Sequence, residues 1–286
     1  MRYHRREVSG QHDGGTMNRL AEIIAKKRQR VITSKDVAPR SVIEAVARQA
    51  RESARRHALR DALIRNDRIN IIAEFKRRSP SKGIIDGDAD PAAVTRIYER
   101  GGVAAISVLT EQDFFNGSLD DLRAVRQTTT LPILRKDFIF DDYQVYESAA
   151  AGAEALLLIV AALDDDSLRR LRELAENELA MDALVEVHTR GEMQRAIDCG
   201  ANIIGVNNRN LATFEVSLST SIGLADSAPA GTILISESGI ETKEDINFLR
   251  DAGYNGFLIG ETLMRSDNPE TLLKEFTQMR EGARMS

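Results

Sequence analysis

Charged side chains interrupt the apolar runs of this 286-residue sequence at the points where several runs end. Glu74 and Lys76 follow one run, Lys136 ends a second, and Glu186 ends a third. Burying an unpaired charge is costly, so these groups must pair with one another or face a wet cavity. Carboxylates and ammonium groups that share a pocket are the residue types that general acid–base catalysis uses.

The spacing of these residues predicts that they face one pocket. Side chains two residues apart lie on the same side of a strand, so Glu74 and Lys76 share a face. Asn207 and Arg209 have the same spacing at the end of a fourth run, and residues 236–239 end a fifth. A polar residue at one strand end is commonly a solvated loop residue, but five such ends together favour an active site.

Histidine and cysteine have plainer interpretations in this chain. His188 has no second histidine at ligand spacing, because His4, His12 and His57 all lie in the N-terminal region. Cys199, the only cysteine, precedes a glycine that is expected to end a helix, so packing is a better interpretation than nucleophilic chemistry. No metal site is predicted. A single cysteine cannot form an intramolecular disulfide, which favours the reducing cytoplasm.

Composition excludes several classes of protein. The chain has 42% hydrophobic and 29% charged residues, which is typical of a globular protein and unlike a disordered one. Its formal net charge of -5 gives no electrostatic reason to bind nucleic acid. The longest apolar stretch, residues 149–163, contains Glu154 and is shorter than the roughly 20 residues that a membrane helix needs. We therefore expect a cytoplasmic protein that binds neither nucleic acid nor membranes.

The elements that must position these residues alternate along the chain. Apolar residues recur at helical spacing within residues 17–30 and 41–64, which predicts two or three amphipathic helices. Short apolar runs with strand character then alternate with helical stretches. The eight predicted strands span residues 71–75, 103–109, 132–136, 155–160, 183–187, 203–206, 232–236 and 256–260.

Eight such units in series predict an α/β fold, a (β/α)8 TIM barrel with an N-terminal helical extension. The strand spacing fits one strand and one crossover helix in each unit. A doubly wound sheet is the alternative, but no G-x-G-x-x-G motif supports a dinucleotide fold. The predicted organisation is a disordered tail over residues 1–16 and a single domain over residues 17–286. Within that domain the extension spans residues 17–70 and the barrel spans residues 71–286.

Two loops are suited to binding a phosphate group. Ser238 and Gly239 follow the seventh predicted strand, and Gly260 and Glu261 follow the eighth. Glycine turns and helix N-termini expose backbone N–H groups, and these are the two loops where barrels commonly bind phosphate. The loop after the first strand adds hydroxyl and cationic donors, among them Ser79. Each loop alone is weak evidence, but together they predict a phosphorylated small-molecule substrate.

The motif over residues 71–83, IIAEFKRRSPSKG, resembles the signature of the indole-3-glycerol phosphate synthase family. The resemblance continues through the motifs LRKDF, LVEVH, GVNNR, SESGI and FLIGETLM, and it covers residues 17 to about 279. It implies a (β/α)8 barrel whose N-terminal helices fold over the mouth of the barrel. It also implies conversion of 1-(2-carboxyphenylamino)-1-deoxyribulose 5-phosphate into indole-3-glycerol phosphate, CO2 and water. This reaction belongs to tryptophan biosynthesis and uses no metal or organic cofactor.

The resemblance implies a role for each site residue. Lys136 corresponds to the general acid that protonates the oxygen at the substrate carbonyl carbon, with Glu186 as its acid/base partner. Glu74 is a second carboxylate, Lys76 is a cation that engages the substrate, and Asn207 belongs to the same catalytic group. The other implied residues bind the substrate or its phosphate: Ser79, Arg209, Ser238, Gly239, Gly260, Glu261, Phe138, Leu157 and Ile159. The last three form an apolar slot for the aromatic ring.

Several questions stay open from the sequence. The division of acid chemistry between Lys136 and Lys76 is one of them. A second ammonium group and partial desolvation would lower the pKa of a catalytic lysine, whereas nearby carboxylates would raise it. Because a carboxylate repels phosphate, we expect only the backbone N–H of Glu261 to contribute.

Other functions and partners are weighed beside this interpretation. One alternative is a class I aldolase or another phosphate-binding barrel enzyme, with Lys136 as the Schiff-base nucleophile. Another is a non-catalytic barrel that serves as a scaffold, although a retired site has no reason to keep buried charges. A weak association with other tryptophan-pathway enzymes is a further expectation.

Overall fold

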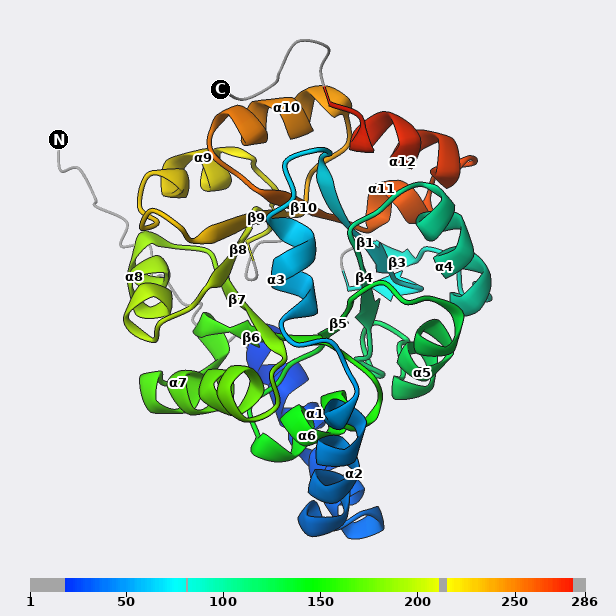
Figure 1. Ribbon diagram of the computed structural model, residues 1–286, viewed down its shortest axis with the longest axis vertical. Helices are drawn as coiled ribbons and strands as arrows, with labels where there is room; N and C mark the ends of the chain where they lie inside the picture. Colours follow the sequence, from blue (N-terminus) through cyan, green and yellow to red (C-terminus); the bar gives the residue numbers. More distant parts are fainter. Residues whose placement is uncertain (1–18, 81, 211–214, 280–286) are drawn as a thin grey trace, which may run out of the picture.

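The computed structural model describes residues 19–80, 82–210 and 215–279, and this part of the chain forms a closed barrel of eight parallel strands (Figure 1). The barrel strands are β1 (Asn70–Phe75), β4 (Ala105–Leu109), β5 (Ile133–Lys136), β6 (Ala155–Ile159), β7 (Asp182–Val187), β8 (Ile203–Asn207), β9 (Ile233–Glu237) and β10 (Gly256–Ile259). β1 closes the ring by pairing with both β4 and β10. The predicted barrel is therefore confirmed, while the predicted tail over residues 1–16 lies outside the described residues.

Helices cover the outside of the barrel between successive strands (Figure 1). They are α4 (Pro91–Arg100), α5 (Leu119–Thr128), α6 (Asp142–Ala150), α7 (Asp165–Glu173), α8 (Arg190–Asp198), α9 (Ser219–Ala225), α10 (Lys243–Asp251), α11 (Glu261–Met264) and α12 (Pro269–Thr277). Left-handed glycines follow four of these helices, where they end the helix: Gly102, Gly152, Gly200 and Gly253. A short hairpin of β2 (Arg78–Ser79) and β3 (Gly83–Ile84) follows β1.

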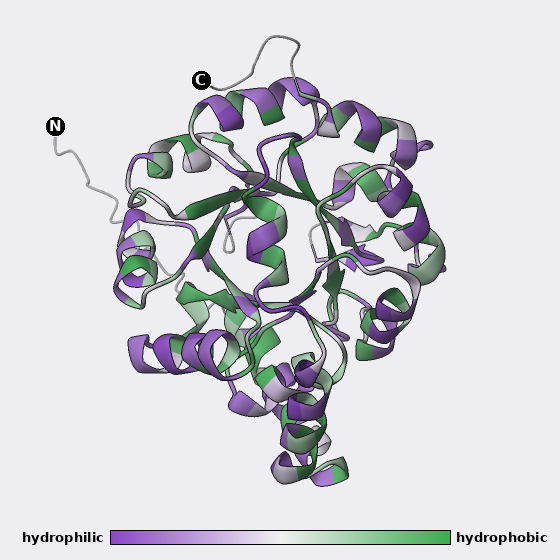
Figure 2. Ribbon diagram, in the orientation of Figure 1, coloured by the Kyte–Doolittle hydropathy of each residue, from purple (hydrophilic) through white to green (hydrophobic). Residues whose placement is uncertain are grey.

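The strands read as apolar because both of their faces are buried. Figure 2 shows the apolar colouring of the ring of strands and the polar colouring on the outer sides of the helices. Outward-facing strand residues pack beneath the helices in one large cluster. Inward-facing residues, such as Ile72, Leu134 and Leu184, form a second cluster inside the barrel. On β5 and β7 this inward alternation continues two residues later to Lys136 and Glu186.

The N-terminal extension forms three helices that reach both ends of the barrel. Helix α1 (Arg19–Val37) lines the cavity at the carboxyl ends of the strands with residues of its first turns, and α2 (Arg40–Glu52) packs against α6. Helix α3 (Ala58–Leu63) lies at the opposite end, where Figure 1 shows it across the centre of the ring. Family resemblance placed the extension over the mouth, and α1 is its only described helix that lines the mouth cavity.

Helix α3 is held at the amino ends of the strands by polar contacts and by burial. The Arg60 N–H donates to the carboxylate of Asp182, the first residue of β7. The side chain of Asn70, the first residue of β1, donates to the Leu63 carbonyl. Leu59 and Leu63 are 0% and 1% exposed inside the barrel cluster. Burial of these two leucines fills the bottom of the barrel and explains the position of the helix.

Candidate active site

A cavity of about 810 Å³ opens at the carboxyl ends of the barrel strands. This is the edge at which enzymes of this fold carry out their chemistry. Every residue that the sequence singles out for the site lines this one cavity: Glu74, Lys76, Ser79, Lys136, Phe138, Leu157, Ile159, Glu186, Asn207, Arg209, Ser238, Gly239, Gly260 and Glu261. The geometry brings all of them together, and the catalytic or binding role of each stays a prediction.

Lys136 is the centre of the charged part of the cavity. Its Nζ lies 2.9 Å from Glu186 Oε2 and 3.0 Å from Glu237 Oε2. The side chains of Glu186 and Glu237 are 2% and 1% exposed, so this ammonium group compensates two buried carboxylates, and the His188 ring lies 3.7 Å from Glu186 Oε1 as a second basic neighbour. Sequence reasoning missed Glu237.

The three buried groups shift one another's pKa values. Burial alone would lower the pKa of Lys136, but the charges of Glu186, Glu237 and Glu74 more than offset it and raise the pKa. Burial would also raise the pKa of Glu186, yet the ammonium group of Lys136 holds it below its ordinary value. For Glu237, burial and the neighbouring Glu186 outweigh Lys136 and raise the pKa to about 7. The carboxylates thus decide the balance that the sequence left open, and Lys136 is protonated.

Two inward-facing glycines make room for the buried carboxylates. A Cβ atom at Gly205 would lie 2.1 Å from Glu237 Oε1, and a Cβ atom at Gly260 would lie 2.4 Å from Glu74 Oε1. Distances below 3.0 Å require something to move. Glu74 in turn holds Lys76, whose Nζ lies 2.7 Å from Glu74 Oε1. The lack of a side chain at Gly205 and Gly260 therefore leaves the space that the carboxylates of Glu237 and Glu74 occupy.

The side of the cavity that the sequence assigns to phosphate is built from the ends of β9 and β10. Ser238 and Gly239 both have left-handed backbones, with φ of 68° and 76°. The Glu261 carboxylate lies 3.6 Å from Arg209 Nη2 and 3.2 Å from Arg265 Nε. These arginines compensate the negative charge of Glu261. The expectation that only its backbone N–H binds the phosphate stays a prediction.

Apolar side chains form another part of the cavity wall. Phe138, Leu157 and Ile159 line it as the sequence predicts, and Phe115 adds a second ring, 6.2 Å from Phe138 between centroids. Leu20 of α1 also lines the cavity. The wall is suited to a flat apolar group, since aromatic side chains pack best against rings and aliphatic chains.

Buried ion pairs hold α1 on the mouth. Lys27 Nζ donates to Asp137 Oδ2 at 2.6 Å, with side-chain exposures of 5% and 0%. Arg135 donates to the same oxygen at 2.9 Å, and so does the hydroxyl of Thr110 at 2.6 Å. Although burial would raise the pKa of Asp137, Lys27 and Arg135 lower it to about 2. The residue that follows Lys136 in the chain is thereby tied to the N-terminal extension.

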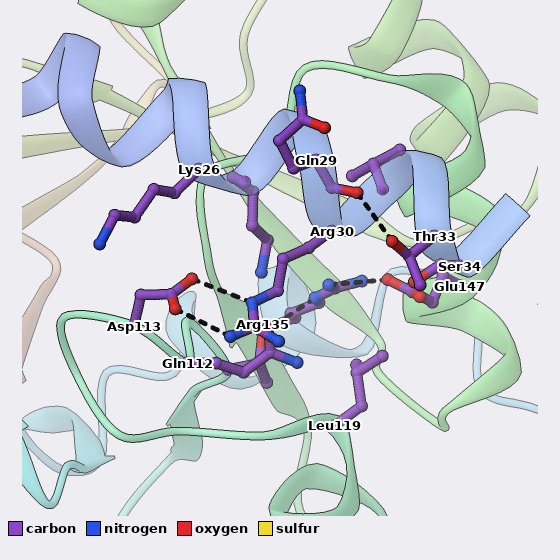
Figure 3. A pocket seen from close by; sticks show the side chains of 13 residues that line it. Lys26, Gln29, Arg30, Thr33, Ser34, Gln112, Asp113, Leu119, Arg135 and Glu147 are labelled. Carbon is purple, nitrogen blue, oxygen red and sulfur yellow. Dashed lines mark hydrogen bonds and ion pairs between the residues drawn. The ribbon is translucent and has the colours of Figure 1, made fainter.

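A second cavity, of about 420 Å³, lies beneath α1 and is seen from close by in Figure 3. There Arg30 of α1 forms two hydrogen bonds with Asp113, at 2.9 and 2.8 Å. Arg135 lies 2.9 Å from Glu147 Oε2. These charges are paired with one another, so this cavity marks where α1 is fastened to the barrel.

Sequence reasoning missed Glu237, Phe115 and Leu20, and the sequence pattern indicates the direction of their side chains to different degrees. Glu237 continues the inward alternation of Ile233 and Ile235, so period two alone would place it in the barrel. Phe115 lies in a loop after β4, where no periodicity indicates a direction. Leu20 lies on the predicted first helix, but helical periodicity does not say what its apolar face covers.

The described residues contain neither a cluster suited to a metal ion nor a helix suited to spanning a membrane. No group of three or more His, Cys, Asp or Glu side chains in residues 19–80, 82–210 and 215–279 is arranged to hold a metal ion. None of the helices in the same ranges combines the length and the hydropathy that crossing a membrane requires.

Solved structures with similar folds share little sequence with this chain. The thiamine phosphate pyrophosphorylase of Pyrococcus furiosus superimposes with a TM-score of 0.55 at 17% identity, over 76% of this chain and 95% of its own. The 3-hexulose-6-phosphate synthase of Salmonella typhimurium gives a TM-score of 0.59 at 10% identity, over 73% and 96%. At such low identity these likenesses concern the fold alone.

Sequence relatives are much closer. A protein of Carboxydothermus hydrogenoformans named indole-3-glycerol phosphate synthase is 43% identical over 89% of this chain and 98% of its own length. The proteins of the same name from Polaromonas naphthalenivorans and Koribacter versatilis are 45% and 50% identical, over 90% and 72% of this chain and 97% and 79% of their own lengths. The family model described as indole-3-glycerol phosphate synthase matches residues 20–276. This chain therefore belongs to the indole-3-glycerol phosphate synthase family.

Proposed function

We propose that this protein closes the indole ring of 1-(2-carboxyphenylamino)-1-deoxyribulose 5-phosphate and releases CO2, water and indole-3-glycerol phosphate. The observation that carries the proposal is the Lys136 ammonium group, buried between the carboxylates of Glu186 and Glu237 at the base of the cavity. Family membership supports the same reaction. The reaction is one step of tryptophan biosynthesis and makes the protein a carboxy-lyase.

Ring closure needs an acid at the substrate carbonyl. The aromatic carbon that bears the carboxylate bonds to the carbonyl carbon, and the carbonyl oxygen becomes an alkoxide that must take up a proton. We assign this proton to Lys136, which its raised pKa keeps charged. An alkoxide is more basic than an amine, so a lysine with a raised pKa still protonates it. Because two carboxylates hold the ammonium group, it stabilises the developing charge without reorganisation.

The later steps need a base and a second acid. Loss of CO2 returns its electron pair to the ring and restores aromaticity. Dehydration then removes the new hydroxyl as water and a proton from the adjacent carbon. We assign the base to Glu186, whose lowered pKa keeps it ionised, and the acid to Lys76, which is oriented by Glu74. Glu237, with a pKa of about 7, is suited to exchanging protons with Lys136.

Substrate binding is divided between the two sides of the cavity in this proposal. The aromatic ring lies in the apolar slot of Phe138, Leu157 and Ile159. The phosphate binds backbone N–H groups at Ser238 and Gly239. In the same proposal Gly260 and the backbone of Glu261 complete the phosphate site, Ser79 and Arg209 add polar contacts, and Asn207 contacts the reacting part of the substrate.

A Schiff-base mechanism is less compatible with the charged site. A lysine nucleophile must be neutral, whereas Lys136 is surrounded by carboxylates that raise its pKa. Borohydride trapping with a keto-phosphate tests this alternative directly. Covalent labelling of Lys136 would support an aldolase-type reaction.

The remaining expectations stay predictions. We propose that residues 17–286 act as one domain, because the extension lines the cavity through Leu20 and fills the barrel through Leu59. Cys199 is free and buried, which is compatible with the proposed cytoplasmic location. Independence of metal and cofactor, absence of nucleic-acid binding and weak association with other tryptophan-pathway enzymes are further proposals.

The direct test is indole fluorescence on mixing the protein with the carboxyphenylamino-deoxyribulose phosphate in EDTA. The chain contains no Trp, so the background is low. A rise in indole fluorescence supports both the reaction and its independence of metal. A flat trace from well-folded protein, with active relatives as the positive control, would overturn the proposed activity.

A further inference from the structure

Asn208 lies between two residues of the candidate site but is not itself part of the cavity wall. Asn207 and Arg209 line the cavity, whereas Asn208 is 2% exposed and packs behind the loop that follows β9. The alternation of side chains along an extended segment accounts for this difference. The mechanism above leaves Asn208 without a role.

The Asn208 side chain is hydrogen-bonded at both of its ends. Its Nδ2 donates to the Ser238 carbonyl oxygen at 3.1 Å and to the Ser236 hydroxyl at 3.0 Å. Its Oδ1 accepts from the backbone N–H and the hydroxyl of Ser221 at 3.0 and 2.8 Å. The backbone N–H of Asn208 also donates to the Glu237 carbonyl at 2.8 Å. Asn208 therefore holds the chain at two consecutive residues, Glu237 and Ser238.

The loop needs this support because its backbone is strained. Ser238 has a φ of 68°, a left-handed conformation that is strained for a non-glycine residue. Gly239 follows with a φ of 76°, and a Cβ atom there would lie 2.4 Å from Val216 Cγ1. Strain of this kind persists only where surrounding contacts fix the conformation. The bond from Asn208 to the Ser238 carbonyl is the side-chain contact that fixes it here.

We infer that Asn208 is a positioning residue that shapes the Ser238–Gly239 loop to bind the phosphate group of the substrate. This inference rests on the proposed function, because it takes that loop to be the phosphate site. Asn is suited to the task, since its amide can donate to the loop while its oxygen accepts from Ser221. The ligand class is a phosphate monoester.

Asn208→Ala tests the inference, because it removes both bonds from Nδ2, together with the two that Oδ1 accepts from Ser221, and substitutes no residue of the cavity wall. We expect the KM for the phosphorylated substrate to rise about tenfold, as loss of well-made hydrogen bonds predicts, while kcat stays within about twofold. The inhibition constant of inorganic phosphate should rise by a similar factor. Turnover of the substrate without its phosphate group should not change. A purely structural role for Asn208 would not separate these quantities.

Tyr254→Phe is the matched control. It removes the hydrogen bond from the Tyr254 hydroxyl to the Ser221 carbonyl, 2.7 Å long, in the same buried network but away from the loop. We expect it to leave the KM and phosphate inhibition unchanged. If Asn208→Ala does not fold, Asn208→Ser keeps a polar group that is too short to reach the Ser238 carbonyl and tests the same contact.

Unchanged KM and phosphate inhibition in a folded Asn208 variant would overturn the inference. An equal rise in Tyr254→Phe would overturn it too, and so would an effect confined to kcat. Failure of the proposed function is distinguishable, because the unsubstituted protein would then give no indole fluorescence. Calorimetric binding of inorganic phosphate, compared between that protein and the variant, would still decide the role of Asn208: weaker binding supports it and equal binding refutes it.

Discussion

The two ends of the barrel interior hold opposite kinds of side chain, charged at the carboxyl ends of the strands and apolar at the amino ends. At the carboxyl ends of the strands, Lys136 lies between the buried carboxylates of Glu186 and Glu237. At the amino ends, Leu59 and Leu63 of α3 fill the interior with apolar side chains that are 0% and 1% exposed. Inward-facing strand residues such as Leu134 and Leu184 belong to the same apolar cluster as these two leucines.

A single strand can therefore contribute both to the stability of the barrel and to the chemistry of the site. On β5 the inward residue Leu134 is followed two residues later by Lys136, and on β7 Leu184 is followed by Glu186. Apolar contacts need only volume and exclusion of water, whereas buried charges need partners at fixed distances. A change at the bottom should therefore affect the free energy of unfolding, and a change at the mouth should affect turnover.

The largest expected effect is at the mouth, with Lys136→Ala. We expect kcat to fall by about 10⁴-fold, the upper range for loss of a general acid, because among the described residues no ammonium group other than that of Lys136 pairs with both Glu186 and Glu237. Circular dichroism should still show a folded barrel. Single-turnover assays with the phosphorylated substrate provide the measurement. If this variant kept near-full kcat, Lys136 would not be the general acid, and the assignment of catalysis to the charged end of the barrel would be wrong.

Leu59→Ala tests the bottom of the barrel. The truncation should lower the free energy of unfolding by about 3 kcal/mol, within the range for fully buried leucines. Urea unfolding followed by circular dichroism gives this quantity. Below the unfolding transition we expect kcat and KM to be unchanged. A large loss of kcat in the folded variant would show that the two ends are not independent.

Glu237→Gln tests how the charged end of the barrel makes the free energy of unfolding depend on pH. Burial raises the pKa of Glu237 to about 7 from 4.5, so the folded protein holds this proton more tightly than the unfolded chain does. Its contribution to stability is complete below pH 4.5 and is lost as the pH rises to about 7. The variant lacks this loss, so its stability relative to the unsubstituted protein should increase over that window. Urea unfolding at several pH values measures the difference, and parallel curves would contradict the assignment.

The smallest effects concern the ion pairs that hold α1. Lys27→Met breaks a buried pair, but Asp137 keeps Arg135 and Thr110, so we expect a loss of about 2 kcal/mol, below the cost of isolating a buried charge. Lys35→Met breaks the ion pair between Lys35 and Asp141. The side chains of these two residues are 39% and 31% exposed. We expect under about 1 kcal/mol for that exposed pair. Thermal unfolding of both variants makes the comparison, and equal losses would refute the distinction between buried and exposed pairs.

Much of the site could be predicted because it follows from local order. The alternation along 71–75, 132–136 and 183–187 placed Glu74, Lys136 and Glu186 on inward faces before any fold was known. The same alternation, continued from Ile233 and Ile235, places Glu237 on an inward face, but nothing in the sequence indicates which residue it would pair with. Only closure of the barrel brings it within 3.0 Å of Lys136.

The eight strands of the barrel and their order along the chain could be predicted from the sequence, because apolar runs are properties of adjacent residues; the β2–β3 hairpin was not predicted. The shared face of Glu74 and Lys76 also follows from their spacing alone. Only the tertiary structure shows that α3 packs at the bottom of the barrel while the first turns of α1 line the mouth cavity, since helical periodicity marks an apolar face without naming its partner. It also decided that the pKa of Lys136 is raised, because that balance depends on distances between residues up to about a hundred positions apart in the chain.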